Sequence, residues 1–165
     1  MKLNSFKSEI PDIFEQVKKD VKKVIGRRRA GLSLGLVEMG MTPQGFIGAY
    51  HVAPGHYIIM NKTPLKMILQ EQTHIIVKAY TYHVLLHEYI HSLGILDEQK
   101  CRSVTLKITE ALFEKDDPEL IFAQKGIAAY FPNINVIYAP PDLTPHGLSV
   151  EYVSGFDKES HTYFS

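Results

Sequence analysis

The chain has 165 residues, and its 45% of hydrophobic and 22% of charged residues are typical of a globular protein in water. Basic and acidic residues both number 18, so the net charge is zero, which argues against a nucleic-acid-binding protein. No apolar stretch approaches the roughly 20 residues that cross a bilayer, and the N-terminal residues lack the apolar centre of a signal peptide. With one cysteine, Cys101, and thus no internal disulfide, we predict a single cytoplasmic domain over residues 1–165, with no membrane and no nucleic-acid partner.

The N-terminal part predicts one helix followed by three short strands. Apolar residues recur at helical spacing from Ile10 to Ile25, Ser8 can cap the start of this helix, and Gly26 can end it. Three segments of strand character follow, separated by glycine and proline turns: 32–39, 45–52 and 56–61. Their close spacing predicts a meander in which the last segment, 56–61, forms an edge of the sheet.

The rest of the chain predicts mainly helices. A helical pattern covers residues 66–93 in one or two pieces and stops at Gly94, a second covers 97–115, and a shorter one runs to about Tyr130. Short strands are expected at 135–139 and 149–153, and the polar residues 156–165 are expected to form a loose tail. This order of elements predicts an α+β fold.

His87, Glu88 and His91 form the motif that points to chemistry. Two histidines four apart on a helix lie on one face, about 6 Å apart along the axis, so both imidazoles can bind one zinc ion. Glu88 projects from nearly the same side, where it can take a proton from a metal-bound water without binding the metal. The motif therefore predicts one zinc ion per chain, with Glu88 as the catalytic general base.

The third zinc ligand is left open by the spacing. Asp97 lies ten residues after His87, and Gly94 allows the chain to turn back, so Asp97 is the first choice. Asp97 also suits the N-cap of the next helix, which would leave Glu98, in the first turn of that helix, as the alternative ligand. Glu110 and His146 are more distant candidates.

The other histidines and several tyrosines have less specific sequence signals. His83 extends the stripe of His87 and His91, but three histidines at steps of four span roughly 12 Å, so we interpret His83 as a packed residue beside the site. His51, His56 and His74 are interpreted as structural or exposed residues. Candidates for a group that stabilises the transition state come from the C-terminal region: Tyr130, Tyr138, Tyr152 and His146.

Residues 87–97, His-Glu-Tyr-Ile-His-Ser-Leu-Gly-Ile-Leu-Asp, resemble the extended metzincin pattern His-Glu-x-x-His-x-x-Gly-x-x-His/Asp, in the aspartate variant of snapalysin-like peptidases. The resemblance implies that His87, His91 and Asp97 bind the metal and that Glu88 is the base. The five methionines all precede the motif, so the methionine turn that follows the third ligand in metzincins is missing here.

The order of elements up to about Lys115 also resembles the minimal gluzincins. That resemblance implies a zincin-like fold, with a small, mostly antiparallel sheet whose edge strand lies over a long active-site helix, plus backing helices. It makes Glu98 or Glu110 the third ligand, and it makes strand 56–61 the rim along which a peptide pairs by main-chain hydrogen bonds.

The leading functional hypothesis is therefore a zinc-dependent peptidase acting on a peptide or protein substrate, with one zinc ion per chain as its cofactor. One alternative is a non-catalytic or highly selective metal-binding regulatory domain, which chelation would destabilise and which would show no activity on any screened substrate. A minor alternative is a single-metal RNA endonuclease, although Arg27–Arg28–Arg29 is the sole basic run and Glu88 is not required by that motif.

Overall fold

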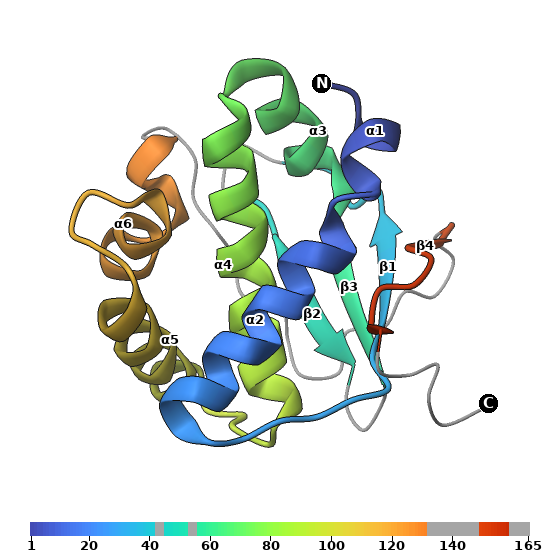
Figure 1. Cartoon of the computed structure of the whole chain (residues 1–165). Coiled ribbons are helices and arrows are strands. Elements are labelled where there is room, and N and C mark those ends of the chain that lie inside the picture. Colours follow the sequence, from blue (N-terminus) through green and yellow to red (C-terminus); the bar gives the residue numbers. More distant parts are fainter. Residues whose placement is uncertain (42–44, 53–55, 132–148, 159–165) are drawn as a thin grey trace.

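The structure is a computed structural model that describes residues 1–41, 45–52, 56–131 and 149–158 (Figure 1). The chain begins with a short helix, α1 (Leu3–Lys7), and the predicted amphipathic helix follows as α2 (Ile10–Ile25). Gly26 ends α2 with a φ of 70°, a left-handed conformation that glycine adopts without steric cost. Ser8 does not cap α2, because it lies in the turn after α1, where its hydroxyl donates to the Ser5 carbonyl.

The described strands form one small mixed sheet in the order β2–β3–β1–β4. Its members are β1 (Ser33–Val37), β2 (Ala49–Val52), β3 (Tyr57–Asn61) and β4 (Glu151–Tyr152). β1 and β3 pair in parallel over five residues, whereas β2 is antiparallel to β3, and β4 is antiparallel to β1. The α+β class is thus confirmed, and the sheet is mixed, with two of its three strand pairs antiparallel.

The edge of the sheet that lies next to the long helix is β2 and not the segment 56–61. The prediction of a meander placed 56–61 last, but residues 33–37 pair with 57–61 in parallel, so β3 has a neighbour on each side. A parallel pair cannot be joined by a tight turn, and here the β2 segment occupies the connection between β1 and β3.

Successive side chains of each strand point to opposite faces of the sheet, and apolar side chains are buried on both faces. Leu36 and Met60 face the main core, which they share with the helices, whereas Val37, Tyr50 and Ile59 form a smaller cluster on the opposite face. Since Tyr50 points away from the helices, its neighbour His51 lies on the helical side of β2.

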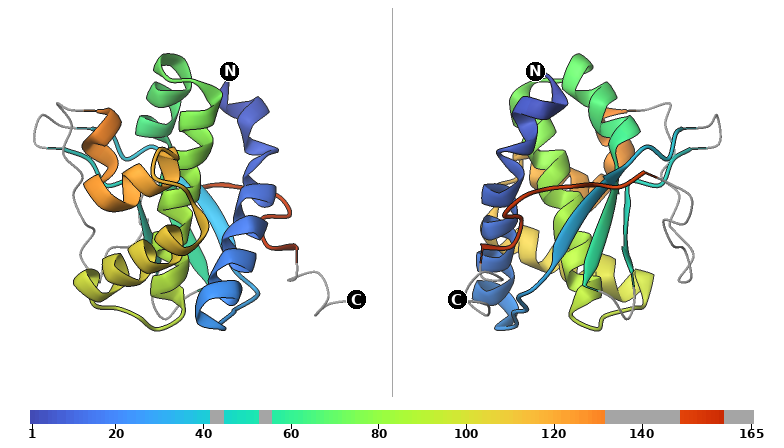
Figure 2. Two further views of the ribbon diagram at one scale, coloured as in Figure 1. Left: turned by 60° about the vertical axis from the view of Figure 1, so that its left-hand side comes forward. Right: turned by 90° about the vertical axis from the view of Figure 1, so that its right-hand side faces the viewer.

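The helices lie as a group beside the sheet (Figures 1 and 2). The helical pattern predicted for 66–93 divides into α3 (Lys62–Glu71) and α4 (His74–Ser92), since Thr73 caps α4 with its side chain. α4 lies between the sheet on one side and α5 (Glu98–Leu112) and α6 (Pro118–Lys125) on the other, and a 3₁₀ turn, η1 (Ile127–Tyr130), follows α6. The strand predicted at 135–139 lies outside the described residues.

The segment after β4 packs against α2 (Figure 2). The ring of Phe156 stacks on Phe14 with a centroid distance of 4.0 Å, and the buried Asp157 carboxylate accepts a hydrogen bond of 2.7 Å from Lys18 Nζ. The loose tail expected from residue 156 therefore does not begin there, because Phe156 and Asp157 are buried. The remainder of that tail, 159–165, lies outside the described residues.

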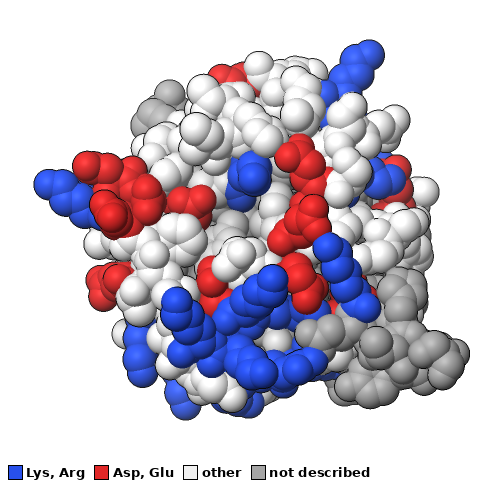
Figure 3. Space-filling view, in the orientation of Figure 1, with Lys and Arg blue, Asp and Glu red and all other residues white. Residues whose placement is uncertain are grey.

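Lysine and arginine side chains gather around the C-terminal end of α2 (Figure 3). Two of these residues have a structural role: Arg27 and Arg29 donate hydrogen bonds to the carbonyls of Leu93 and Ser92. Those carbonyls end α4 and have no partner within the helix, and the positive charge also suits the negative end of the helix dipole. None of the helices in the described ranges is long and apolar enough to cross a membrane.

Candidate metal centre

The predicted motif lies in the last two turns of α4, which is buried on nearly all sides. Thr73 fixes the start of the helix by accepting a hydrogen bond from the Ile76 N–H. After Ser92 the chain leaves the helix, and Gly94, with a φ of 97°, lets it turn towards α5. The turn brings the start of α5 opposite the histidines of α4.

His87 and His91 converge on one carboxylate oxygen, Glu98 Oε1. The Nε2 atom of His87 lies 3.0 Å from this oxygen, and the Nε2 atom of His91 lies 2.7 Å from it. The two rings are 4.8 Å apart between centroids and nearly perpendicular. Because the histidines are four residues apart and Glu98 begins the facing helix, three donor atoms suited to zinc meet at one point.

The hydrogen bonds of His91 show which of its nitrogens carries a proton. Nδ1 lies 2.7 Å from the main-chain oxygen of Ile95, which can only accept, so Nδ1 must donate. In a neutral ring, Nε2 then presents a lone pair to Glu98 Oε1, and two acceptors at this distance repel unless a proton or a metal cation lies between them. Histidines that bind metals are held in this way, with the outer nitrogen donating to a carbonyl and the inner nitrogen free for the metal.

Asp97, the first choice for the third ligand, is instead the N-cap of α5. Its Oδ1 atom accepts a hydrogen bond of 2.7 Å from the Lys100 N–H, as the sequence allowed. Its short side chain is therefore committed to the helix start, whereas Glu98 lies in the first turn and reaches back to α4. Glu98, the alternative ligand, is thus the carboxylate that contacts the two imidazoles.

The more distant candidates do not reach the cluster or lie outside the described residues. Glu110 is exposed on α5, about 18 Å further along the helix than Glu98 at 1.5 Å per residue. Tyr152 lies on β4, at the opposite edge of the sheet from β2, and Tyr130 packs on the Phe122 ring with centroids 5.0 Å apart. His146 and Tyr138 lie in the part of the chain that is not described.

Glu88 is a buried carboxyl beside the histidines. Only 6% of the residue is exposed, and burial raises the pKa of its carboxyl, although the neighbouring His87 and His91 partly oppose this. The main chain of His51, on the edge strand β2, hydrogen-bonds to the carboxyl and also favours its charged form. The edge strand therefore holds Glu88 next to the point where His87, His91 and Glu98 converge.

The electrostatics of the cluster favour positive charge at the converging atoms. Burial lowers the pKa of the His87 imidazole, but hydrogen bonds with Cys101 and Glu98 outweigh it and raise the pKa to about 10. The same groups raise the pKa of His91 to about 11. Burial raises the pKa of Glu98, but the two imidazoles outweigh it and hold it at about 2. A zinc ion binding here would take the place of these protons, so its affinity should rise with pH.

Cys101 is a further donor that faces the cluster from α5. The thiol is fully buried and donates a hydrogen bond of 3.3 Å to the main-chain oxygen of His87. Its Sγ atom and the ring nitrogens of His87 and His91 lie within 4.8 Å of one another. Burial raises the pKa of the thiol, but the two imidazoles outweigh it, so its pKa is lowered overall.

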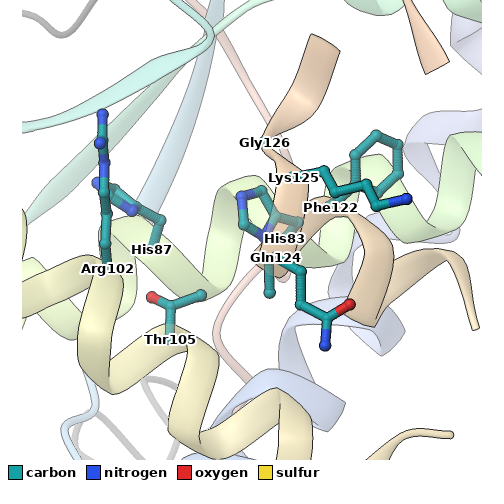
Figure 4. A pocket seen from close by; sticks show the side chains of 9 residues that line it. His83, His87, Arg102, Thr105, Phe122, Gln124, Lys125 and Gly126 are labelled. Atoms are coloured by element: carbon teal, nitrogen blue, oxygen red, sulfur yellow. The ribbon is translucent and has the colours of Figure 1, made fainter. Parts of the chain in front are cut away.

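A cavity of about 310 Å³ opens beside His87, between α4, α5 and α6 (Figure 4). Arg102 stands next to His87 on one side, and Gln124 and Lys125 come from α6 on the other (Figure 4). His83 lines the cavity and stacks on Phe122, with centroids 6.0 Å apart, and burial lowers its pKa to about 3. This agrees with the interpretation of His83 as a packed residue beside the site.

The chain was compared with protein-family models, curated proteins and solved structures. None of these comparisons gives a significant match. An assignment of function therefore rests on the geometry of this cluster.

Two residues of the site were not predicted from the sequence. His51 was interpreted as structural or exposed, and its role comes from its main chain, which no side-chain pattern reveals. Cys101 was not predicted to face the two histidines. A signal for it was present, because Glu98 and Cys101 are three residues apart and so share one face of the helix.

Proposed function

We propose that this chain is a zinc-dependent peptidase that holds one zinc ion through His87, His91 and Glu98. The observation that carries the proposal is the convergence of both Nε2 atoms on Glu98 Oε1, at 3.0 and 2.7 Å, beside the buried Glu88. Two imidazoles and one carboxylate form a common ligand set of catalytic zinc sites, in which the fourth position is left for water.

Glu88 is the residue on which hydrolysis depends. A zinc ion at this site would polarise the scissile carbonyl and lower the pKa of a water molecule towards about 7. Glu88 would accept a proton from the attacking water and later pass it to the leaving amine. Burial shifts the pKa of Glu88 upward, which brings the carboxyl closer to neutral pH, where a general base is most effective.

The edge strand β2 supplies a surface on which an extended peptide can bind. The Asn61 N–H donates to the Gly48 carbonyl, and the antiparallel register then directs the main chain of Tyr50 towards β3 as well. The main-chain groups of Ala49 and His51 therefore point away from β3, towards the side of β2 that pairs with no other described strand, where the His51 main chain already contacts Glu88. A peptide that pairs there would run past Glu88, which the His51 main chain contacts.

Removal and replacement of the metal tests this proposal. We expect the purified protein to cleave a mixed casein substrate, to lose this activity after dialysis against a chelator, and to regain it with zinc but not with magnesium. Zinc suits the two imidazoles, whereas magnesium prefers oxygen ligands. New N-termini would be counted with an amine-reactive dye, and circular dichroism would confirm that the chelated protein remains folded. Full activity in protein shown to be free of metal would contradict the proposal.

A further inference from the structure

We propose that Cys101 is a fourth zinc ligand, which competes with water for the open position of the metal centre. The inference rests on the proposed zinc site and extends it. It assigns to the buried thiol a role that the peptidase mechanism does not use, and it implies that the resting protein holds zinc with four side chains.

The arrangement of the two helices brings four donors together in two pairs. α4 contributes His87 and His91, four residues apart, and α5 contributes Glu98 and Cys101, three apart, so each pair lies on one helix face. The nitrogens and Sγ already lie within 4.8 Å of one another. In a tetrahedral site with the usual zinc bond lengths, a nitrogen and a sulfur ligand are about 3.6 Å apart. A decrease of at most about 1.2 Å in each nitrogen–sulfur separation would therefore bring the thiol within bonding distance of a zinc ion held by the two imidazoles.

The surroundings of the thiol also favour a ligand over a simple packing residue. A cysteine that only fills the core would be surrounded by apolar groups, but the Cys101 Sγ atom lies within 4.8 Å of ring nitrogens of both His87 and His91. The second oxygen of Glu98, Oε2, is buried and has no hydrogen-bond partner among the described residues, and it forms a long ion pair with Arg102 Nε at 3.9 Å. A cation bound among these nitrogen, oxygen and sulfur atoms would give each of them an electrostatic partner.

The consequence is a closed site. Zinc with four protein ligands is typical of structural centres, whereas catalytic zinc keeps one position for water. On binding, the thiol would lose its proton to solvent and ligate as the thiolate. Water could enter only when Cys101 leaves the metal, so the zinc-loaded protein would cleave peptides more slowly than Cys101→Ala.

X-ray absorption at the zinc edge of the zinc-loaded full chain tests the inference without reference to activity. We expect one sulfur neighbour at about 2.3 Å besides nitrogen and oxygen neighbours, and we expect Cys101→Ala to lose that sulfur and keep the zinc. Thr105→Val is the matched control: Thr105 is buried one turn later on α5, and its hydroxyl donates a hydrogen bond to the Cys101 carbonyl, so this variant should keep the sulfur. The cobalt-loaded proteins should show the same pattern in the near-ultraviolet thiolate-to-cobalt band.

The outcomes separate this inference from the proposed function. Zinc bound by nitrogen and oxygen alone in the unaltered protein would overturn the role of Cys101, and this spectrum decides the matter even if Cys101→Ala does not fold. No bound zinc at all would remove the proposed metal centre itself. A gain of casein cleavage in Cys101→Ala would support both, whereas a sulfur ligand with no cleavage by either protein would contradict only the peptidase.

Discussion

Replacement of Glu88 with glutamine should lower the rate of peptide cleavage by about 10²- to 10⁴-fold while zinc stays bound, since this is the usual contribution of a general base. A carboxamide has nearly the shape of the carboxyl and can still accept the hydrogen bond from the His51 main chain, but it cannot take a proton from water. The measurement is kcat/KM on a cleaved casein peptide, together with zinc content per chain for both proteins.

The stability of the same variant provides an internal control. Burial raises the pKa of Glu88, so the folded protein favours the protonated carboxyl, and its ionisation costs stability as the pH rises through that pKa. Glutamine removes this cost, so the variant should unfold at the same temperature as the unaltered protein or a higher one at neutral pH. A protein that is stable, holds zinc and cleaves at the full rate without Glu88 would exclude the proposed base.

Replacement of Glu98 with alanine should weaken zinc binding by more than 100-fold, beyond the 10- to 100-fold loss that is typical of residues outside the first coordination shell. Asp97→Ala is the matched control, because it removes the neighbouring carboxylate from the same turn. Asp97 caps α5, so its loss should cost about 1 kcal/mol of unfolding free energy and leave the affinity for zinc unchanged. Competition with a chromophoric chelator measures the affinity, and urea unfolding of the chelated proteins measures the stability.

The opposite result would redefine the ligand set. If Asp97→Ala lost zinc and Glu98→Ala kept it, the aspartate of the metzincin-like pattern would be the ligand, and α5 would have to begin later than the structure shows. A loss of zinc in both variants, with both proteins folded, would mean that the start of α5 as a whole positions the site.

Much of the fold could be predicted because the signals are local. The apolar spacing from Ile10 to Ile25 and the left-handed Gly26 define α2 from the sequence alone. The order of strands could not be predicted in this way, since pairing is set by contacts between residues far apart in the chain. Nothing near 56–61 indicates that it pairs in parallel with 33–37, and for this reason the edge of the sheet was placed on the wrong strand.

In the candidate site, too, residues on one helix could be predicted, whereas contacts between two helices could not. His87, Glu88 and His91 follow from helical spacing, and the structure places them together. The choice between Asp97 and Glu98 depends on where α5 begins, and helix ends are the least certain feature of a sequence pattern. Both readings of Asp97 were physically sound, and the hydrogen bond to Lys100 selects the cap.

The central claim, that His87, His91 and Glu98 hold a zinc ion, is tested most directly by the metal content of the purified chain. Elemental mass spectrometry should find about one zinc per chain in the unaltered protein and far less in His91→Ala, because the loss of one imidazole weakens zinc binding at the site. A protein that is folded, has been offered zinc and still carries none would contradict the metal centre and, with it, the proposed peptidase.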